Sequence, residues 1–224
     1  MKFNKRPKSI KEAFSLIEML IVMSVIGLLL AMAAPDLFSL VQSSSLTGEG
    51  VNLRNRLTQA QQSALSLNSD VEVRFFKFSD RLDAEITDRY RGYQFFKFDK
   101  LGQMVPLSQM FRIKAPVTVN ESLSTLLDSD AGYEESSFAD DTRYSPAVGE
   151  FEIPIAGETL MADYIAFRFR ADGSTDLPSR PSPDDVWYVT LVQGEGAADS
   201  SQVPDNYFTI QIDSFNGRLT EFRP

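Results

Sequence analysis

The sequence predicts an α+β protein in which one long N-terminal α-helix packs on a mostly antiparallel β domain. Two patterns support this prediction. Residues 14–68 are first almost wholly apolar and then amphipathic with a helical period, whereas residues 69–224 contain short alternating segments separated by turn signals. Hydrophobic residues make up 43% of the 224-residue chain, which is enough to bury a core.

The chain contains no histidine and no cysteine, and this excludes several kinds of functional site. Without histidine there is no Ser-His-Asp or Cys-His relay and no imidazole ligand for a metal ion. Without cysteine there is no thiolate nucleophile, no disulfide and no cysteine-type zinc site. We therefore predict no catalytic residue, no cofactor and no metal site, and we expect that the protein is not an enzyme.

Charge is distributed unevenly along the chain. Residues 1–13 form a basic leader in which the one acid is Glu12. Its basic residues are Lys2, Lys5, Arg6, Lys8 and Lys11. The chain as a whole has a formal charge of −9, so the part after the leader is strongly acidic. An acidic domain lacks the basic surface that displaces counterions from phosphates, and we predict no nucleic-acid partner.

Residues 14–34 read FSLIEMLIVMSVIGLLLAMAA and carry one charge, Glu18. A helix of this length, rising ~1.5 Å per residue, covers the hydrocarbon core of a bilayer. We predict that this segment is the transmembrane part of the N-terminal helix. The basic leader is expected to stay cytoplasmic, which places the domain after the segment in the periplasm.

Three interpretations of the apolar segment compete. It resembles a cleaved secretory signal, because Ala31-Met32-Ala33 has the small-x-small form of a signal-peptidase site, and it also suits an uncleaved anchor. In the third interpretation a short basic peptide is removed on the cytoplasmic side and the helix is kept. Glu18 favours the third, because an unpaired acid costs up to about 2.5–3.5 kcal/mol within a membrane and a signal peptide gains nothing from it.

The residues from Glu12 to Val22, EAFSLIEMLIV, resemble the cleavage and methylation motif of type IV pilins and type II secretion pseudopilins. The resemblance implies that prepilin peptidase cleaves between Ala13 and Phe14 and that the Phe14 amine is methylated. It also implies that Glu18 pairs with the Phe14 amine of a neighbouring subunit during filament assembly. One position departs from the family, which usually has glycine where this chain has Ala13; alanine is also small.

The helix is expected to continue through residues 35–68 outside the membrane. Pro35 stands where family members often carry a kinking proline. Residues 43–50 are rich in serine and glycine, and the helix is expected to fray there. An apolar stripe with helical spacing is predicted to cover the core of the domain. The stripe consists of Leu53, Leu57, Ala60, Ala64 and Leu67. Polar residues beside the stripe are predicted to face water; they are Arg54, Arg56, Gln59 and Gln62.

Residues 69–224 form the predicted β-rich domain. Alternating or β-rich segments predict strands at 71–75, 93–98, 111–114, 164–170, 186–192, 207–212 and 218–222. Turn signals occur at Asp99–Gly102, at Asp172-Gly173-Ser174 and at Asn216-Gly217, where a tight hairpin is expected. The order of the long helix, the strands and the final hairpin resembles that of the minor pseudopilin GspH and pilin FimT group. The overall layout is also similar to that of Verru_Chthon cassette protein D, a prepilin-like family.

Two loops are set apart by their composition. The run 128–141 is rich in acids and lacks basic residues, so it is a minority candidate for calcium, although its spacing matches no EF-hand and a solvated loop is the commoner outcome. Residues 177–185 are rich in proline and predict a surface loop.

We therefore expect a minor pseudopilin or pilin, with other pilin subunits, prepilin peptidase and the inner membrane as partners. The alternative is a secreted or membrane-anchored β-domain binding module.

Overall fold

The computed structural model describes residues 15–79, 88–99, 101–127, 146–155, 157–178, 186–194 and 202–224, without the side chains of 33–42. It confirms the predicted α+β class, with helix α1 (Leu16–Leu67) followed by strands β1 to β10. Contacts divide the chain into two units, Met1–Val41 and Gln42–Pro224. Within the described residues, no helix is long and apolar enough to cross a membrane.

Helix α1 is continuous, and the fraying expected at 43–50 is wrong. Gly50 explains why, because it lets the helix approach sheet residue Phe208 so closely that an added Cβ would lie 2.3 Å from the ring. The helix ends in a Schellman motif. Asn68 adopts φ 49°, and the amide of Ser69 donates to the carbonyl of Ala64 over 3.3 Å. Tertiary packing therefore overrides the low helical propensity of the serine- and glycine-rich stretch.

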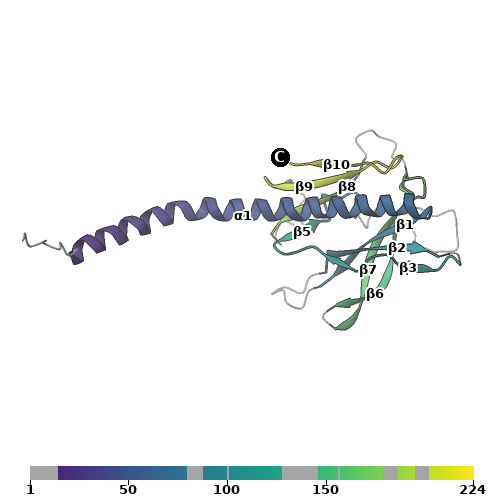
Figure 1. The fold of residues 1–224 in the computed structure, drawn as a ribbon, viewed down its shortest axis with the longest axis horizontal. Helices are drawn as coiled ribbons and strands as arrows, with labels where there is room; N and C mark the ends of the chain where they lie inside the picture. Colours follow the sequence, from purple (N-terminus) through teal and green to yellow (C-terminus); the bar gives the residue numbers. More distant parts are fainter. Residues whose placement is uncertain are drawn as a thin grey trace, which may run out of the picture. The chain divides into compact units, whose positions relative to one another are not determined.

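Two antiparallel sheets follow the helix (Figure 1). The first has the order β3-β2-β1-β7-β6, with β4 also paired to β2. Its strands are β1 (Val71–Phe78), β2 (Arg89–Phe98), β3 (Met104–Pro106), β4 (Phe111–Arg112), β6 (Ala147–Ile155) and β7 (Glu158–Phe169). The second has the order β10-β9-β8-β5. Its strands are β5 (Val117–Asn120), β8 (Trp187–Gln193), β9 (Tyr207–Ile212) and β10 (Leu219–Phe222).

Each predicted strand is present, although the one expected at 111–114 is extended only at Phe111–Arg112. Strands β3, β5 and β6 were not predicted. Strand β6 contains Gly149 and Pro154, which normally weaken a strand. Both are accommodated here, because the ring of Tyr164 fills the space beside Gly149 and because β6 lies at the sheet edge, where a proline removes no ladder bond.

The C-terminal hairpin is confirmed, but its turn is longer than the tight Asn-Gly turn that was expected. The Asp213 amide donates to the Arg218 carbonyl over 3.0 Å, and the Gly217 amide donates to the Asp213 carbonyl over 2.9 Å. Of the two residues Asn216 and Gly217, only the glycine has a positive φ, of 65°. The loop thus has four residues, 214–217, between the hydrogen-bonded residues Asp213 and Arg218.

The main core lies between the second part of α1 and both sheets, and Figure 1 shows this part of the helix running along them. Leu53, Leu57, Ala60 and Ala64 are all buried, as the stripe predicted. Leu67 is 46% exposed and the prediction is wrong there, because the helix ends at this residue.

Of the polar residues beside the stripe, Gln59 and Gln62 are exposed, as predicted. Arg54 and Arg56 are partly covered instead. The Arg56 guanidinium lies 4.3 Å from the ring centre of Phe111, so the aliphatic and planar parts of this arginine serve as packing surface.

A second core lies on the other face of the first sheet. Phe151 of β6 packs against Phe76 of β1 and Phe96 of β2, with ring centres 5.9 and 5.3 Å apart. Strands β2 and β6 are not neighbours in the sheet, so the sheet must curl to bring them together. Strand β1, expected to be half-buried, is therefore covered on both faces.

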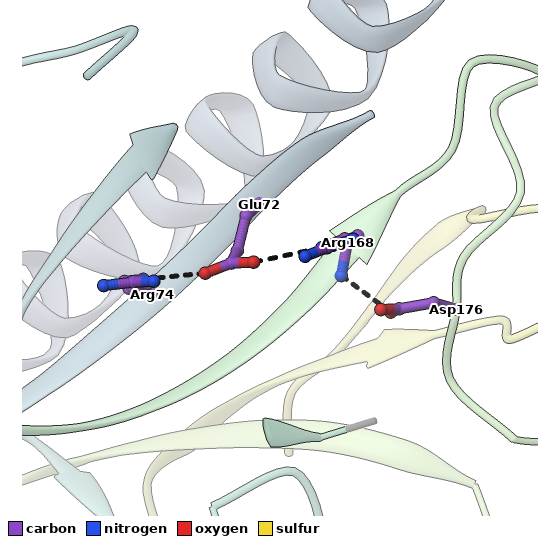
Figure 2. A network of polar contacts seen from close by, with 4 residues as sticks. All are labelled: Glu72, Arg74, Arg168 and Asp176. Carbon is purple, nitrogen blue, oxygen red and sulfur yellow. Dashed lines mark hydrogen bonds and ion pairs between the residues drawn. The ribbon is translucent and has the colours of Figure 1, made fainter. Parts of the chain in front are cut away.

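This curl encloses a network of charged residues (Figure 2). The carboxylate of Glu72, which is fully buried, accepts from Nε of Arg74 over 2.7 Å and from Nε of Arg168 over 3.0 Å. Asp176 extends the network by accepting from the backbone amide of Arg168 over 2.7 Å. The Arg74 guanidinium also lies 4.0 Å from the ring centre of Tyr164. A buried carboxylate between two guanidinium groups links β1 to β7 through paired charge.

Candidate assembly site at the helix N-terminus

The predicted functional residues cluster at the start of α1, and the structure describes them unevenly. Ala13 and Phe14, the predicted cleavage and methylation positions, lie outside the described residues. The backbone is helical at Pro35, but its side chain lies outside the description, so the predicted kink stays a prediction. Glu18 is described, in the first turn of the helix.

Glu18 and Ser15 form a reciprocal cap at the helix start. The Glu18 amide donates to the Ser15 hydroxyl over 3.2 Å, while the Ser15 amide donates to Oε2 of Glu18 over 3.3 Å. This is the capping box S-x-x-E, which satisfies two backbone amides that the helix leaves unpaired. The carboxylate also lies at the positive end of the helix dipole, where a negative charge is favoured.

One half of the Glu18 carboxylate has no partner among residues that the structure describes. The Ser15 hydroxyl donates to Oε2 over 3.4 Å, so the amide and the hydroxyl of Ser15 both bind the same oxygen. Within the described part of the chain, Oε1 of Glu18 therefore accepts no hydrogen bond and is able to accept one from another group. An ammonium group from outside this unit could bind there without breaking the cap.

The helix on both sides of Glu18, from Leu16 to Met32, presents apolar side chains all around. The exposed fraction ranges from 44% at Val22 to 85% at Leu16. The large apolar residues involved are Leu16, Ile17, Met19, Leu20, Ile21, Val22, Met23, Val25, Ile26, Leu28, Leu29, Leu30 and Met32. Ser24 adds no exposed donor, because its hydroxyl donates to the Leu20 carbonyl over 2.8 Å. An apolar surface that surrounds a helix in this way is typical of segments buried in lipid or among other helices.

Among the described side chains, the site offers one carboxylate, one hydroxyl and an apolar helix surface, which are groups that bind partners by hydrogen bonding and packing. Three or more potential acidic metal ligands do not lie together in the described part of the chain. The 128–141 run, the minority calcium candidate, lies outside that part, as does 179–185 of the proline-rich loop.

Among the described residues of the unit Gln42–Pro224, two groups have a displaced pKa. Burial raises the pKa of the Tyr93 hydroxyl, although the nearby Arg56 opposes this shift. The hydroxyl and then the amide of Ser174 donate to Asp172 and lower the pKa of its carboxyl below the ordinary 3.8. Tyr93 packs among aromatic rings and Asp172 caps a turn, so each shift has a structural cause.

Sequence reasoning missed the cap and the buried charges. Ser15 precedes Glu18 by three residues, which is the sequence signal of a capping box. Glu72 and Arg74 stand two residues apart among the apolar residues of the segment Val71–Phe76, which is a usable signal of a same-face ion pair. The third member, Arg168, is distant in sequence and needed the strand register, which places it opposite Glu72.

Comparisons with known proteins bear on the N-terminal site. Residues 8–34 match the family described as Prokaryotic N-terminal methylation motif. This match confirms the predicted resemblance of the N-terminus to type IV prepilin-like proteins. Comparison with curated proteins found no match. Among solved structures, the chain is similar to the minor pseudopilin EpsH from the Type 2 Secretion System of Vibrio cholerae. The TM-score is 0.39 and the identity 10%, over 80% of this chain and 98% of that chain.

Proposed function

We propose that the protein is a minor pseudopilin or pilin, a structural subunit of a type II secretion pseudopilus or a type IV pilus. Prepilin peptidase removes residues 1–13, the new Phe14 amine is methylated, and the subunit joins a filament through its N-terminal helix. The observation that carries this proposal is the N-terminal methylation motif at 8–34, in which Glu18 is the one acid of an otherwise apolar helix surface.

The free capacity of Glu18 supports a role in assembly. Its Oε2 is engaged by Ser15, and an ammonium group from a neighbouring subunit would complete the charge balance through Oε1. In an apolar filament core this pair replaces two costly isolated charges with a neutral unit. Because the pair forms in one alignment of two helices, it also fixes the register between subunits.

Membrane anchorage before assembly belongs to the same proposal. The apolar segment 14–34 extends beyond the described side chains at both ends, and it is preceded by the basic leader. The positive-inside tendency then leaves the N-terminus in the cytoplasm and the β domain in the periplasm. The prepilin peptidase site would face the cytoplasm, and the work of the subunit is mechanical rather than enzymatic.

Replacing Glu18 tests the proposal. Glu18→Ala is expected to leave membrane insertion and cleavage at Phe14 intact while reducing incorporation into filaments, since the Phe14 amine loses its partner. The readout is the amount of processed chain in sheared filaments relative to the membrane fraction. Glu152→Ala removes an exposed acid of β6 and is the matched control, expected to incorporate normally. Normal incorporation of Glu18→Ala would contradict the assembly role.

A further inference from the structure

The turn between β9 and β10 contains the dipeptide Asn216-Gly217, and its asparagine is exposed to water. Asparagine before glycine is chemically labile, because glycine has no side chain to keep its backbone nitrogen away from the asparagine side chain. In deamidation, that nitrogen loses its proton and bonds to the side-chain carbonyl carbon of the asparagine, and ammonia leaves. Water then opens the resulting succinimide ring and gives aspartate or isoaspartate.

The turn uses both residues of this dipeptide. Gly217 has a positive φ of 65°, and a Cβ added to it would collide with the Gly173 carbonyl oxygen and lie 2.6 Å from Nε2 of Gln61. A larger residue would therefore displace the backbone at Gly173. The Oδ1 atom of Asn216 accepts from the Arg218 amide over 2.7 Å, which is a turn bond that only a short polar side chain makes. The labile pair is thus built into the hairpin.

Asp213 binds both of the groups that would react. Its backbone carbonyl accepts from the Gly217 amide over 2.9 Å, so the attacking nitrogen keeps its proton in a hydrogen bond. Its carboxylate accepts from the side-chain nitrogen of Asn216 over 3.0 Å, and this nitrogen is the one that must leave. The carboxylate also accepts from the amides of Phe215 and Asn216, over 2.8 and 3.3 Å. Deamidation requires these bonds to break.

The charge of Asp213 opposes the reaction as well. Attack on the side-chain carbon of Asn216 places a negative charge on Oδ1, in an amide group whose nitrogen lies 3.0 Å from the Asp213 carboxylate. Two negative charges at such short range repel each other. The Arg218 amide, which donates to Oδ1, would by itself stabilise the charge that develops there. Protection of the asparagine therefore depends on Asp213.

Helix α1 and the loop after β7 also hold this turn. The Gln61 side chain donates to the Asn216 carbonyl over 3.1 Å and to the Gly173 carbonyl over 2.8 Å. The Thr175 hydroxyl donates to the Ser214 carbonyl over 2.8 Å. Bonds to two other segments of the chain make local opening of the turn less frequent.

We propose that Asn216 is a deamidation site that Asp213 keeps unreactive in the folded protein, and that opening of the turn converts it to aspartate or isoaspartate. Conversion to aspartate puts a second carboxylate where the Asn216 side chain now donates to Asp213, so an attractive contact becomes a repulsive one and the turn loosens. The proposal is independent of the proposed function, because the hairpin belongs to the unit Gln42–Pro224 and the assembly site to the unit Met1–Val41.

Incubation of the full chain in detergent micelles at mildly alkaline pH tests this proposal. Mass spectrometry of proteolytic peptides measures how fast the asparagine form of residue 216 disappears. Asp213→Ala is expected to raise that rate by about tenfold or more, because it removes three hydrogen bonds to a carboxylate together with its charge. Equal rates in the unmodified chain and in Asp213→Ala would overturn the proposal.

Asp99→Ala is the matched control. The Asp99 carboxylate also accepts from two turn amides, those of Leu101 and Gln103, each over 2.8 Å. Its loss is expected to leave the deamidation rate of Asn216 unchanged, because Asp99 belongs to the turn between β2 and β3. An acceleration as large as that from Asp213→Ala would show that general loosening of the domain is the cause, and would contradict the role of Asp213.

The unmodified chain supplies a test that needs no variant. Deamidation of Asn216 is expected to be at least about tenfold faster in urea-unfolded chain than in folded chain, because unfolding breaks every bond of the turn. Fluorescence of the single tryptophan, Trp187, reports which state is being incubated. Deamidation at equal rates in the two states would overturn the proposal, even if Asp213→Ala failed to fold.

Asn216→Asp imitates one product of the reaction. Amide hydrogen exchange at Gly217 is expected to speed up in this variant, because two carboxylates then face each other in the turn. Asn216→Ser is the control, since it keeps a short acceptor for the Arg218 amide without adding a charge, and it is expected to speed up exchange less. Exchange that is as fast in Asn216→Ser as in Asn216→Asp would contradict repulsion as the consequence of deamidation.

Discussion

Glu18 and Glu72 both stand in apolar segments, and they differ in burial and in whether a described cation balances their charge. Glu72 in β1 is fully buried and has two arginines within 3.0 Å, so its counter-charges come from its own chain. Glu18 in the first turn of α1 is exposed, and its described partners are the amide and hydroxyl of Ser15. The first charge is balanced within the chain, while the second is capped but not balanced by any described cation.

The helix that carries Glu18 shows the same division along its length. From Leu16 to Met32 its apolar side chains are exposed, whereas Leu53 and Leu57 are buried against the two sheets. One part of a single helix is thus stabilised by its own domain, while the described apolar side chains of the other part are exposed. Substitutions in the two parts should therefore affect different observables.

The largest effect on folding is expected from removing the buried glutamate. Glu72→Ala leaves Arg74 and Arg168 without their shared carboxylate and is expected to lower the free energy of unfolding by about 3–5 kcal/mol. Urea unfolding, followed by fluorescence of the single tryptophan Trp187, measures this. Glu18→Ala in the same assay is expected to change the unfolding free energy of the domain little. Equal losses from the two variants would refute the distinction between the two acids.

A slightly smaller effect is expected from the two parts of the apolar helix surface. Leu57→Ala opens a cavity between α1 and the sheets and is expected to cost about 2–5 kcal/mol of unfolding free energy. Leu28→Ala makes the same chemical change where the side chain is 64% exposed and is expected to leave domain unfolding unchanged. The same tryptophan assay compares them, and destabilisation by Leu28→Ala would show that this part of the helix packs on its own domain.

The cap at the helix start is expected to have a local effect. Ser15→Ala removes the hydroxyl that accepts from the Glu18 amide and should cost about 1 kcal/mol of helical stability in the first turn. Amide hydrogen exchange is expected to speed up for the first-turn residues, with no change in the domain. Ser15→Asp restores a capping acceptor and is the control; equally fast exchange in that variant would argue against capping as the cause.

The smallest effect concerns pH. Hydrogen bonds from Ser174 lower the pKa of Asp172, so the ionised form is favoured in the folded state. The stabilisation is present above the ordinary pKa of 3.8 and is lost as the pH falls through the lower folded value. Ser174→Ala is expected to raise the pKa of Asp172 toward 3.8, as measured by NMR titration of its carboxyl. An unaltered titration would assign the shift to another cause.

Periodicity predicted the parts of the fold that depend on local pattern. The stripe Leu53 to Ala64 and the alternating strands β7, β8 and β9 were recognisable, because one face of each element is consistently apolar. Strand β6 was not, since Gly149 and Pro154 are tolerated only through the Tyr164 ring and the edge position. Contacts with residues distant in the sequence therefore allow β6 to form despite its glycine and proline.

The candidate site could be identified from the sequence more readily than the contacts that support the fold around the buried charges. Glu18 stood out because it is the single charge of an apolar segment, and the family match to 8–34 agrees with that emphasis. The curl of the first sheet, which buries Glu72 and Arg74, depends on contacts between β2 and β6 that are far apart in sequence. No local sequence pattern encodes such a contact. Strand β1 was therefore expected to be half-buried, whereas the structure covers it on both faces.

Mass spectrometry of the mature N-terminus tests the central claim most directly. The chain purified from membranes is expected to begin at Phe14 and to carry one methyl group on the Phe14 amine. An N-terminus at Ala34 would instead indicate a cleaved secretory signal, and an intact Met1 an uncleaved anchor. Either of these two results would contradict processing as a prepilin and favour a secreted or anchored β-domain binding module.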